Sequence, residues 1–356
     1  MKQLKKILLL QLLLLLIAKG QAQNFFAANH PYISYTGRID FSNKALPRFW
    51  QPGVYIEIEF FGTAAAVIVN DEVLWGKNHN YLQVVVDGQA RRLKTRAATD
   101  TIQVAKGLAN TKHHLLICKN TEANIGYLEL VGIICQQLLP PPAKPTRKIE
   151  CIGNSITCGS GSDQSAVPCG KGVWQDQHNA WLSYGAITAR SLHAQFHLSS
   201  VSGIGLMHSC CNMEVVMPQV YDKISMRDNK ISWNFKQYQP DVITVCLGQN
   251  DGIQDSAIFC NNYTRFIKTL RGYYPNATIV LLSSPMANTA LRNFMRSSLA
   301  AVVKAVNKAV NKKDTRLHYY IFEQSYNEGC DGHPSLQQHE QIAQLLSGHI
   351  KKLMKW

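Results

Sequence analysis

Short runs of alternating apolar and polar residues, separated by turn residues, characterise the chain from about Ile33 to Cys135. Side chains that alternate in this way point to opposite faces of a strand, so each run predicts a half-buried β-strand. Turn sequences such as Asp87–Gly88 lie between the runs. This region is therefore predicted to be an antiparallel β-sandwich. The runs span residues 54–61, 65–69, 81–86, 101–104, 114–118 and 126–134.

A proline-rich segment, residues 139–147, separates this region from the rest of the chain. Its prolines cannot donate hydrogen bonds to a sheet, and they favour an extended, stiff backbone. We therefore expect a linker here, between a sandwich domain over residues 23–138 and a second domain over residues 148–356.

Beyond the linker, apolar strand-like runs alternate with segments of helical period. Such alternation predicts a parallel sheet covered by helices on both faces, which is a three-layer α/β/α domain. The strand-like runs are residues 148–152, 196–201, 242–247, 278–282 and 317–322, and the helical segments are 181–192, 213–224, 257–270, 290–312 and 336–353.

The first residues have the pattern of a secretory signal. Three lysines precede an apolar run, and small residues follow at Gly20 and Ala22. This predicts a signal peptide over residues 1–22 and a secreted or periplasmic protein. The alternative is a membrane anchor, but the run is short for a bilayer and no later run is long enough to span one.

The net charge is +14, of which the leader contributes four lysines. The basic residues are spread through helices and linker, and no nucleic-acid-binding motif accompanies them. We interpret the charge as solvated surface and expect no nucleic-acid partner.

Ten cysteines in an exported chain permit disulfides. Cys118, Cys151 and Cys246 lie in apolar strand-like runs and are expected to be buried. None of the ten shows the C-x-x-C spacing of a zinc site, so neither a metal nor another cofactor is expected. Six more cysteines lie in or near loops and could form disulfides whose pairing the sequence leaves open: Cys158, Cys169, Cys210, Cys211, Cys260 and Cys330.

Ser155 is the candidate nucleophile. The apolar run 148–152 breaks into Gly–Asn–Ser, as a parallel strand does at its carboxyl end, and ligands of open α/β sheets bind at that edge. A helix cap or turn would explain the serine equally well. Two more polar clusters, residues 248–251 and 331–334, each follow a predicted strand, and a parallel sheet would bring all three clusters together.

A serine hydroxyl needs a base, and His333 is the candidate. A partner must orient the ring, and Asp331 is the expected one. If Asp331 points away, a backbone carbonyl could hold the ring instead, leaving a serine–histidine dyad.

Attack on an ester creates an oxyanion, which preorganised donors stabilise. The expected donors are the Ser155 backbone N–H, the Asn250 side chain and a glycine N–H. That glycine is either Gly203 or Gly205, because both follow the second predicted strand.

The order of these blocks along the chain resembles that of the SGNH (GDSL-like) hydrolases, and several segments narrow the resemblance to carbohydrate esterase family 2. The resemblance implies a jelly-roll sandwich followed by a flavodoxin-like three-layer SGNH domain. It also implies an acetyl esterase acting on polysaccharides such as xylan or glucomannan. The segments that carry it are residues 113–123, Gly126, 153–157, 183–185, 202–205 and 331–335.

The spacing Asp331-x-His333 is shorter than the Asp-x-x-His of most SGNH enzymes but is shared by that family. The residue between the two is often aromatic in the family and is a glycine here. Trp174, Trp181 and Tyr184 are predicted to bind the substrate in its place, since aromatic faces suit sugar rings. Core packing is the alternative for these three residues.

These observations together predict an exported serine esterase that removes O-acetyl groups through an acetyl-Ser155 intermediate. Its expected partner is an acetylated polysaccharide or oligosaccharide, and it is expected to be a monomer. Two alternatives remain at this stage. One is a lipase or thioesterase with the same site, and the other is a non-catalytic glycan-binding protein.

Overall fold

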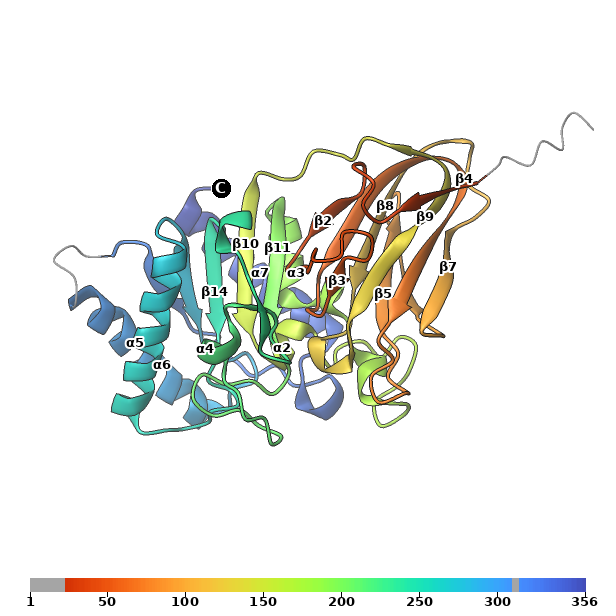
Figure 1. Cartoon of the computed structure of the whole chain (residues 1–356). Coiled ribbons are helices and arrows are strands. Elements are labelled where there is room, and N and C mark those ends of the chain that lie inside the picture. Colours follow the sequence, from red (N-terminus) through yellow and green to blue (C-terminus); the bar gives the residue numbers. More distant parts are fainter. Residues whose placement is uncertain (1–22, 309–313) are drawn as a thin grey trace, which may run out of the picture.

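The computed structural model describes residues 23–308 and 314–356. A β-sandwich formed by the first part of the chain lies beside an α/β unit formed by the rest (Figure 1). The predicted signal peptide, residues 1–22, lies outside the described residues, as does the end of the helix predicted over 290–312. Among the helices within the two described ranges, none combines the length and apolar character needed to cross a bilayer.

Strand β4, Tyr55–Asp71, is the centre of the sandwich. Its first half pairs with β2 and β8 and its second half mainly with β7 and β9, always antiparallel, so one long strand serves both layers. Ile56, Ile58 and Phe60 alternate into the core, as the sequence pattern predicts. The other strands are β1 Asn24–Ala27, β2 Ser34–Thr36, β3 Arg48–Phe49, β5 Tyr81–Val86, β6 Gln89–Lys94, β7 Thr99–Ala105, β8 Thr111–Lys119 and β9 Leu128–Leu139, with the 3₁₀ turn η1 Ala123–Ile125 before β9.

The pattern predicted two strands where β4 is one. Residues 62–64 interrupt the apolar alternation, and there the pairing with β9 shifts register, as at a β-bulge. The short strands β1, β2 and β3 were not predicted, because two to four residues carry too little periodicity to recognise. Strand β6 was not predicted either, because its residues are mostly polar and exposed.

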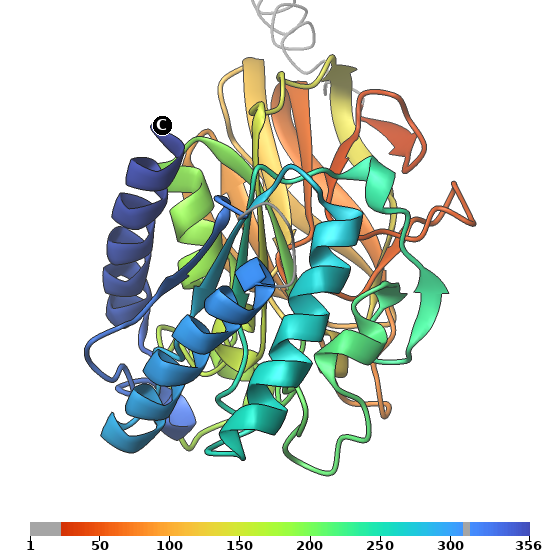
Figure 2. The ribbon, with the colours of Figure 1, turned by 90° about the vertical axis from the view of Figure 1, so that its left-hand side faces the viewer.

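The α/β unit is built on a five-stranded, fully parallel sheet of order β11-β10-β14-β15-β16. In chain order this is the 2-1-3-4-5 arrangement of flavodoxin-like folds. Helices α5 and α6 cover one face, as Figure 2 shows, and α3 and α7 cover the other, so the predicted three-layer fold is confirmed. The strands are β10 Arg147–Gly153, β11 Ala194–Ser200, β14 Val242–Cys246, β15 Thr278–Leu282 and β16 Leu317–Tyr320, and β12 Lys223–Ser225 pairs separately with β13 Lys230–Ser232.

The helices confirm the predicted segments with one large exception. The segment 213–224 was predicted to be helical throughout, but only α4, Met217–Val220, forms. Pro218 favours a helix start, and the residues before it run without regular structure. The remaining helices are α2 Ser155–Cys158, α3 Tyr184–Ser191, α5 Ser256–Tyr273, α6 Thr289–Lys308 and α7 Leu336–Met354, with 3₁₀ turns η2 Trp174–Gln177, η3 Ala180–Leu182, η4 Phe235–Gln237 and η5 Cys330–Gly332.

A buried ion pair links the two units. Arg38, between β2 and β3, reaches Glu150 of β10 with 2.9 Å between Nη2 and Oε1, and the two side chains are 1% and 0% exposed. The guanidinium also donates to the backbone carbonyls of Tyr221 and Lys223. Apolar packing continues the contact, since the rings of Tyr55 and Phe196 lie 4.9 Å apart. The sandwich is therefore fixed against the sheet that carries the polar clusters.

Replacing Arg38 with alanine should lower the free energy of unfolding by about 3 to 5 kcal/mol, because a buried carboxylate would lose its cation. Urea denaturation followed by tryptophan fluorescence measures the change. Arg296→Ala is the matched control: its ion pair with Glu323 is exposed, so its denaturation midpoint should stay near that of the unsubstituted protein. An Arg38→Ala midpoint equal to that of the control would contradict this role of the pair.

Candidate active site

Ser155 is the first residue of α2 and follows β10 directly. Asn154 caps the short helix, because its Oδ1 accepts the Ile156 N–H at 3.2 Å. A Cβ on Gly153 would lie 2.1 Å from Thr157 Oγ1, so glycine is needed for this close approach. The Gly–Asn–Ser sequence thus holds the Ser155 hydroxyl at the carboxyl end of the strand.

His333 meets Ser155 from the loop before α7. Its Nε2 lies 2.8 Å from Ser155 Oγ, and its Nδ1 lies 3.1 Å from the carbonyl oxygen of Cys330. A carbonyl oxygen can only accept a hydrogen bond, so Nδ1 carries the proton and Nε2 is free to accept one from the serine. Serine and imidazole therefore have the geometry of a nucleophile and its base.

Asp331 does not occupy the position expected for it. It is exposed, with a left-handed φ of 52°, and the Cys330 carbonyl takes the ring nitrogen that it was predicted to bind. The tight turn explains the difference: the His333 N–H also donates to the Cys330 carbonyl, at 3.0 Å, which brings that oxygen to the ring in place of the carboxylate. The arrangement found is the alternative, in which a backbone carbonyl orients the histidine.

Burial lowers the pKa of His333 below its usual value of 6.5. The Cys330 carbonyl and the charge of Asp331 act in the opposite direction, but burial outweighs them. The ring is therefore neutral near pH 7, the state in which it can accept a proton.

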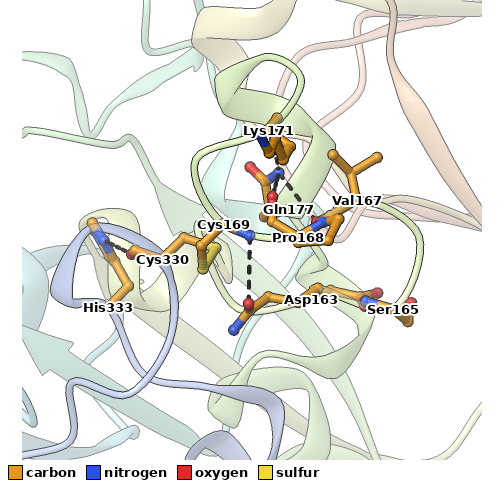
Figure 3. Close-up of a disulfide and its surroundings, with 10 residues drawn as sticks. Asp163, Ser165, Val167, Pro168, Cys169, Lys171, Gln177, Cys330 and His333 are labelled. Carbon is orange, nitrogen blue, oxygen red and sulfur yellow. Dashed lines mark hydrogen bonds between the residues drawn. A yellow bond between two sulfur atoms is a disulfide. The ribbon is translucent and has the colours of Figure 1, made fainter.

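A disulfide between Cys169 and Cys330 fixes the residue that holds the histidine. Figure 3 shows this bond beside the hydrogen bond from His333 to Cys330. The Cys330 N–H also donates to the Gly161 carbonyl, at 2.7 Å. Two loops far apart in the sequence are thus joined at the carbonyl that orients the ring.

The other cysteines divide into two groups. Cys210 and Cys211, adjacent in sequence, form a second disulfide. Cys118, Cys151 and Cys246, which were expected to be buried in strands, are buried and free. Cys158 and Cys260 were candidates for disulfides but are free as well, Cys158 buried and Cys260 half-buried. Cys135 is also buried and free.

Two of the candidate oxyanion donors share a cavity with Ser155. Gly203 and Asn250 line the same cavity as the serine, and Gly203 has no intramolecular acceptor for its N–H within the described residues. Gly205 is different: its N–H donates to Ser209 Oγ at 3.1 Å, and it lies outside the lining of the cavity. The open choice between the two glycines therefore falls on Gly203. Asn250 uses one amide hydrogen on the Ile204 carbonyl, at 2.8 Å, and keeps a second.

The cavity over Ser155 has a volume of about 650 Å³ and lies between the two units. The α/β unit supplies the reactive side chains, and both units supply the rest of the lining, a contribution of the sandwich that the sequence did not predict. Lining residues from the sandwich are Lys77, Asn78, Glu122, Asn124 and Ile125.

Of the three aromatic residues predicted to bind substrate, only Trp174 lines the cavity. It is 36% exposed, and its ring lies 5.5 Å from that of His333. Trp181 instead packs against Arg190, whose guanidinium carbon lies 3.8 Å from the ring centre. Tyr184 is fully buried and bonds to Thr157, with 2.9 Å between the hydroxyls. Trp181 and Tyr184 therefore lie outside the lining of the cavity: Trp181 is half-buried and packs against the core, and Tyr184 is part of the core.

Potential metal ligands do not gather anywhere in the two described ranges: they contain no group of three histidine, cysteine, aspartate or glutamate side chains placed to hold an ion.

Comparisons with known proteins agree over both units. The family model "Carbohydrate esterase 2 N-terminal" matches residues 35–142, and the model of the GDSL-like Lipase/Acylhydrolase family matches residues 151–342. The acetylxylan esterase / glucomannan deacetylase of Cellvibrio japonicus is 28% identical over 340 residues, which cover 93% of this chain and 91% of that protein.

Cellulase/esterase CelE of Acetivibrio thermocellus is 32% identical over 344 residues, covering 92% of this chain and 40% of that protein. The chain thus spans less than half the length of this relative. A solved structure of a family two carbohydrate esterase from Clostridium thermocellum, in complex with cellohexaose, superposes with a TM-score of 0.83 at 31% identity, covering 91% of this chain and 99% of that one. Matched along its sandwich and its GDSL-like domain alike, the chain belongs to carbohydrate esterase family 2.

Proposed function

We propose that this chain is an exported O-acetyl esterase that deacetylates polysaccharides of the xylan or glucomannan type. The observation that carries the proposal is the 2.8 Å contact between Ser155 Oγ and His333 Nε2 inside a cavity large enough for a sugar ester. The substrate class is supported by the Cellvibrio japonicus relative, whose name describes acetylxylan and glucomannan deacetylation.

In the proposed reaction, Ser155 Oγ attacks the acetyl carbon while His333 Nε2 accepts the hydroxyl proton. The negative charge that develops on the carbonyl oxygen is stabilised by the N–H groups of Ser155, Gly203 and Asn250. His333 then gives its proton to the sugar oxygen, which leaves as a free hydroxyl. The product of this half-reaction is acetyl-Ser155.

Water completes the cycle. His333 takes a proton from the water as its oxygen attacks acetyl-Ser155, and the same donors stabilise the second oxyanion. The proton returns to Ser155 Oγ when acetate leaves. The Cys330 carbonyl holds the imidazole through both steps, because it accepts from Nδ1 whether or not Nε2 is protonated.

Sugar recognition is proposed for Trp174, whose exposed ring stands beside His333 at the cavity wall. Export through the leader over residues 1–22 is part of the proposal, and the disulfides fit an oxidising compartment. A monomer is proposed as the working state.

A second candidate keeps the same site but changes the acyl group. Ile125, Val173, Met213 and Met286 give the cavity an apolar wall, which a longer acyl chain could contact. A panel of 4-nitrophenyl esters from acetyl to decanoyl separates the two functions. The proposed esterase should prefer acetyl, and a preference for long chains would favour the lipase or thioesterase.

Ser155→Ala should lower acetate release from acetylated xylan by at least about 10⁴-fold, because no other group can form the acyl intermediate. Released acetate is measured by an enzymatic assay, and circular dichroism confirms that the variant is folded. Activity retained within tenfold would remove Ser155 from the mechanism.

Asp331→Asn should lower kcat by less than about tenfold, because the carboxylate is not bonded to the ring. A triad carboxylate that does bond to its histidine costs about 10⁴-fold when it becomes an amide. Steady-state kinetics on 4-nitrophenyl acetate distinguish the two cases. A loss near 10⁴-fold would place Asp331 on the ring in the working enzyme.

The pH dependence of kcat/KM should show an acid limb with its midpoint below 6.5. His333 must be neutral to accept the serine proton, and burial lowers its pKa, so protonation inactivates the enzyme only below that usual value. Below the midpoint, kcat/KM should fall about tenfold per pH unit. A midpoint clearly above 6.5 would mean that an anionic partner stabilises the charged ring.

A further inference from the structure

The candidate oxyanion glycine lies in a turn that has two possible forms. The Ile204 N–H donates to the Val201 carbonyl at 3.3 Å, which closes a four-residue turn with Ser202 and Gly203 at its centre. The Gly203 φ of 84° is that of the third residue of a type II turn. A type I turn over the same residues differs by a rotation of the central peptide, which joins Ser202 to Gly203.

The two forms would have opposite effects on an oxyanion. A trans peptide is planar, and its C=O and N–H point in opposite directions. Rotation of the central peptide would therefore turn the Gly203 N–H away from the oxyanion and point the Ser202 carbonyl oxygen toward it. A carbonyl oxygen would repel the oxyanion, so the orientation of this one peptide decides whether the turn helps or hinders the reaction.

Contacts within the α/β unit hold groups on either side of the central peptide but not that peptide itself. Asn250 Nδ2 donates to the Ile204 carbonyl at 2.8 Å. The Ser202 hydroxyl lies 2.9 Å from that of Ser160. Neither contact involves the Ser202 carbonyl or the Gly203 N–H.

The sandwich supplies one contact to the central peptide and one to the peptide before it. Asn124 Nδ2 lies 3.4 Å from the Ser202 carbonyl oxygen, which belongs to that peptide. Glu122 Oε2 accepts the Ser202 N–H at 3.1 Å, on the other side of the same residue. Both side chains come from the loop between β8 and β9, and both line the cavity over Ser155. Together they favour the orientation in which the Gly203 N–H points away from Asn124.

A buried lysine side chain holds this loop. Lys119 is 0% exposed, and its Nζ donates to the backbone carbonyls of Thr121 at 2.7 Å and Glu122 at 3.2 Å. Burial lowers the pKa of Lys119 to about 7 and raises that of Glu122, which is 1% exposed. Burying an amine and a carboxyl is costly. Apolar residues would be enough here if the sandwich only packed against the α/β unit. The buried side chains of Lys119 and Glu122 therefore indicate a further function of this loop.

We infer that the sandwich takes part in catalysis through Glu122 and Asn124, which position the Ser202–Gly203 peptide so that the Gly203 N–H faces the oxyanion. The inference rests on the proposed esterase function and deepens it. Both are positioning residues, since they act through Gly203. Without the sandwich, the α/β unit would keep the nucleophile and the base, but the Gly203 N–H would no longer be held in one orientation.

The test compares kinetics on 4-nitrophenyl acetate for three variants. Asn124→Ala removes the donor to the Ser202 carbonyl, and Glu122→Met removes the acceptor at similar volume. Each should lower kcat by about 10- to 100-fold with KM changed less than threefold, since a lost oxyanion donor costs about 10²- to 10³-fold. Glu122→Gln keeps an acceptor oxygen and should restore kcat to within threefold of the unsubstituted enzyme.

A second readout uses phenylboronic acid, which forms a tetrahedral adduct on a reactive serine. Its inhibition constant should rise by the same factor as kcat falls in Asn124→Ala and Glu122→Met. Glu72→Met is the matched control: Glu72 also crosses from the sandwich to the α/β unit, with its Oε2 2.9 Å from Arg227 Nη1, but it does not touch the turn. This control should lose stability and keep kcat within threefold.

The outcomes separate this inference from the proposed function. An unsubstituted enzyme that releases no acetate would overturn both. An active enzyme whose Asn124→Ala and Glu122→Met variants keep kcat and boronate affinity would overturn the inference alone. So would a loss in Glu72→Met equal to theirs, because the effect would then be general weakening of the contact between the units. If Glu122→Met fails to fold, Asn124→Ala decides, because Asn124 is only half-buried.

Discussion

The site depends on the register of three neighbouring parallel strands, β11, β10 and β14, whose carboxyl ends are aligned. Gly153 at the end of β10 is paired with Ser200 of β11 on one side and with Cys246 of β14 on the other. The chain therefore leaves all three strands at the same height, and the segments that carry the serine, the glycine turn and the asparagine emerge side by side. The strand order also changes direction between β10 and β14, which is where open α/β sheets form their ligand crevice.

The sandwich completes what the sheet begins. It covers the crevice with a second wall, and the buried Arg38–Glu150 pair fixes it to the strand that leads to Ser155. Groups of the site that are held by contacts between the two units need little reorganisation during the reaction. Such preorganisation of polar groups is the largest contribution to the rate enhancement of many enzymes. The same logic applies at the histidine, where a disulfide and a backbone carbonyl hold the ring without a carboxylate.

The sequence predicted most strands of the sheet and the site residues that follow them, because hydrophobic period and turn residues are local signals. Ser155 and Asn250 could be found because each closely follows a buried apolar strand, whereas His333 was found from its place after the last strand and beside Asp331. Trp181 and Tyr184 could not be told from core aromatics, because their sequence neighbourhood is the same in both cases. The position of Asp331 relative to His333 is set by the conformation of one backbone turn. The contribution of the sandwich to the cavity is set by how the two units pack. Neither leaves a periodic trace in the sequence.

Activation of Ser155 by His333 can be measured by peptide mass spectrometry of the folded protein after reaction with a fluorophosphonate, which phosphonylates a serine only where a base and an oxyanion site activate it. We expect one adduct per chain, on Ser155, and none in a His333→Ala variant. An adduct on another serine, or labelling of Ser155 that persists without His333, would contradict it.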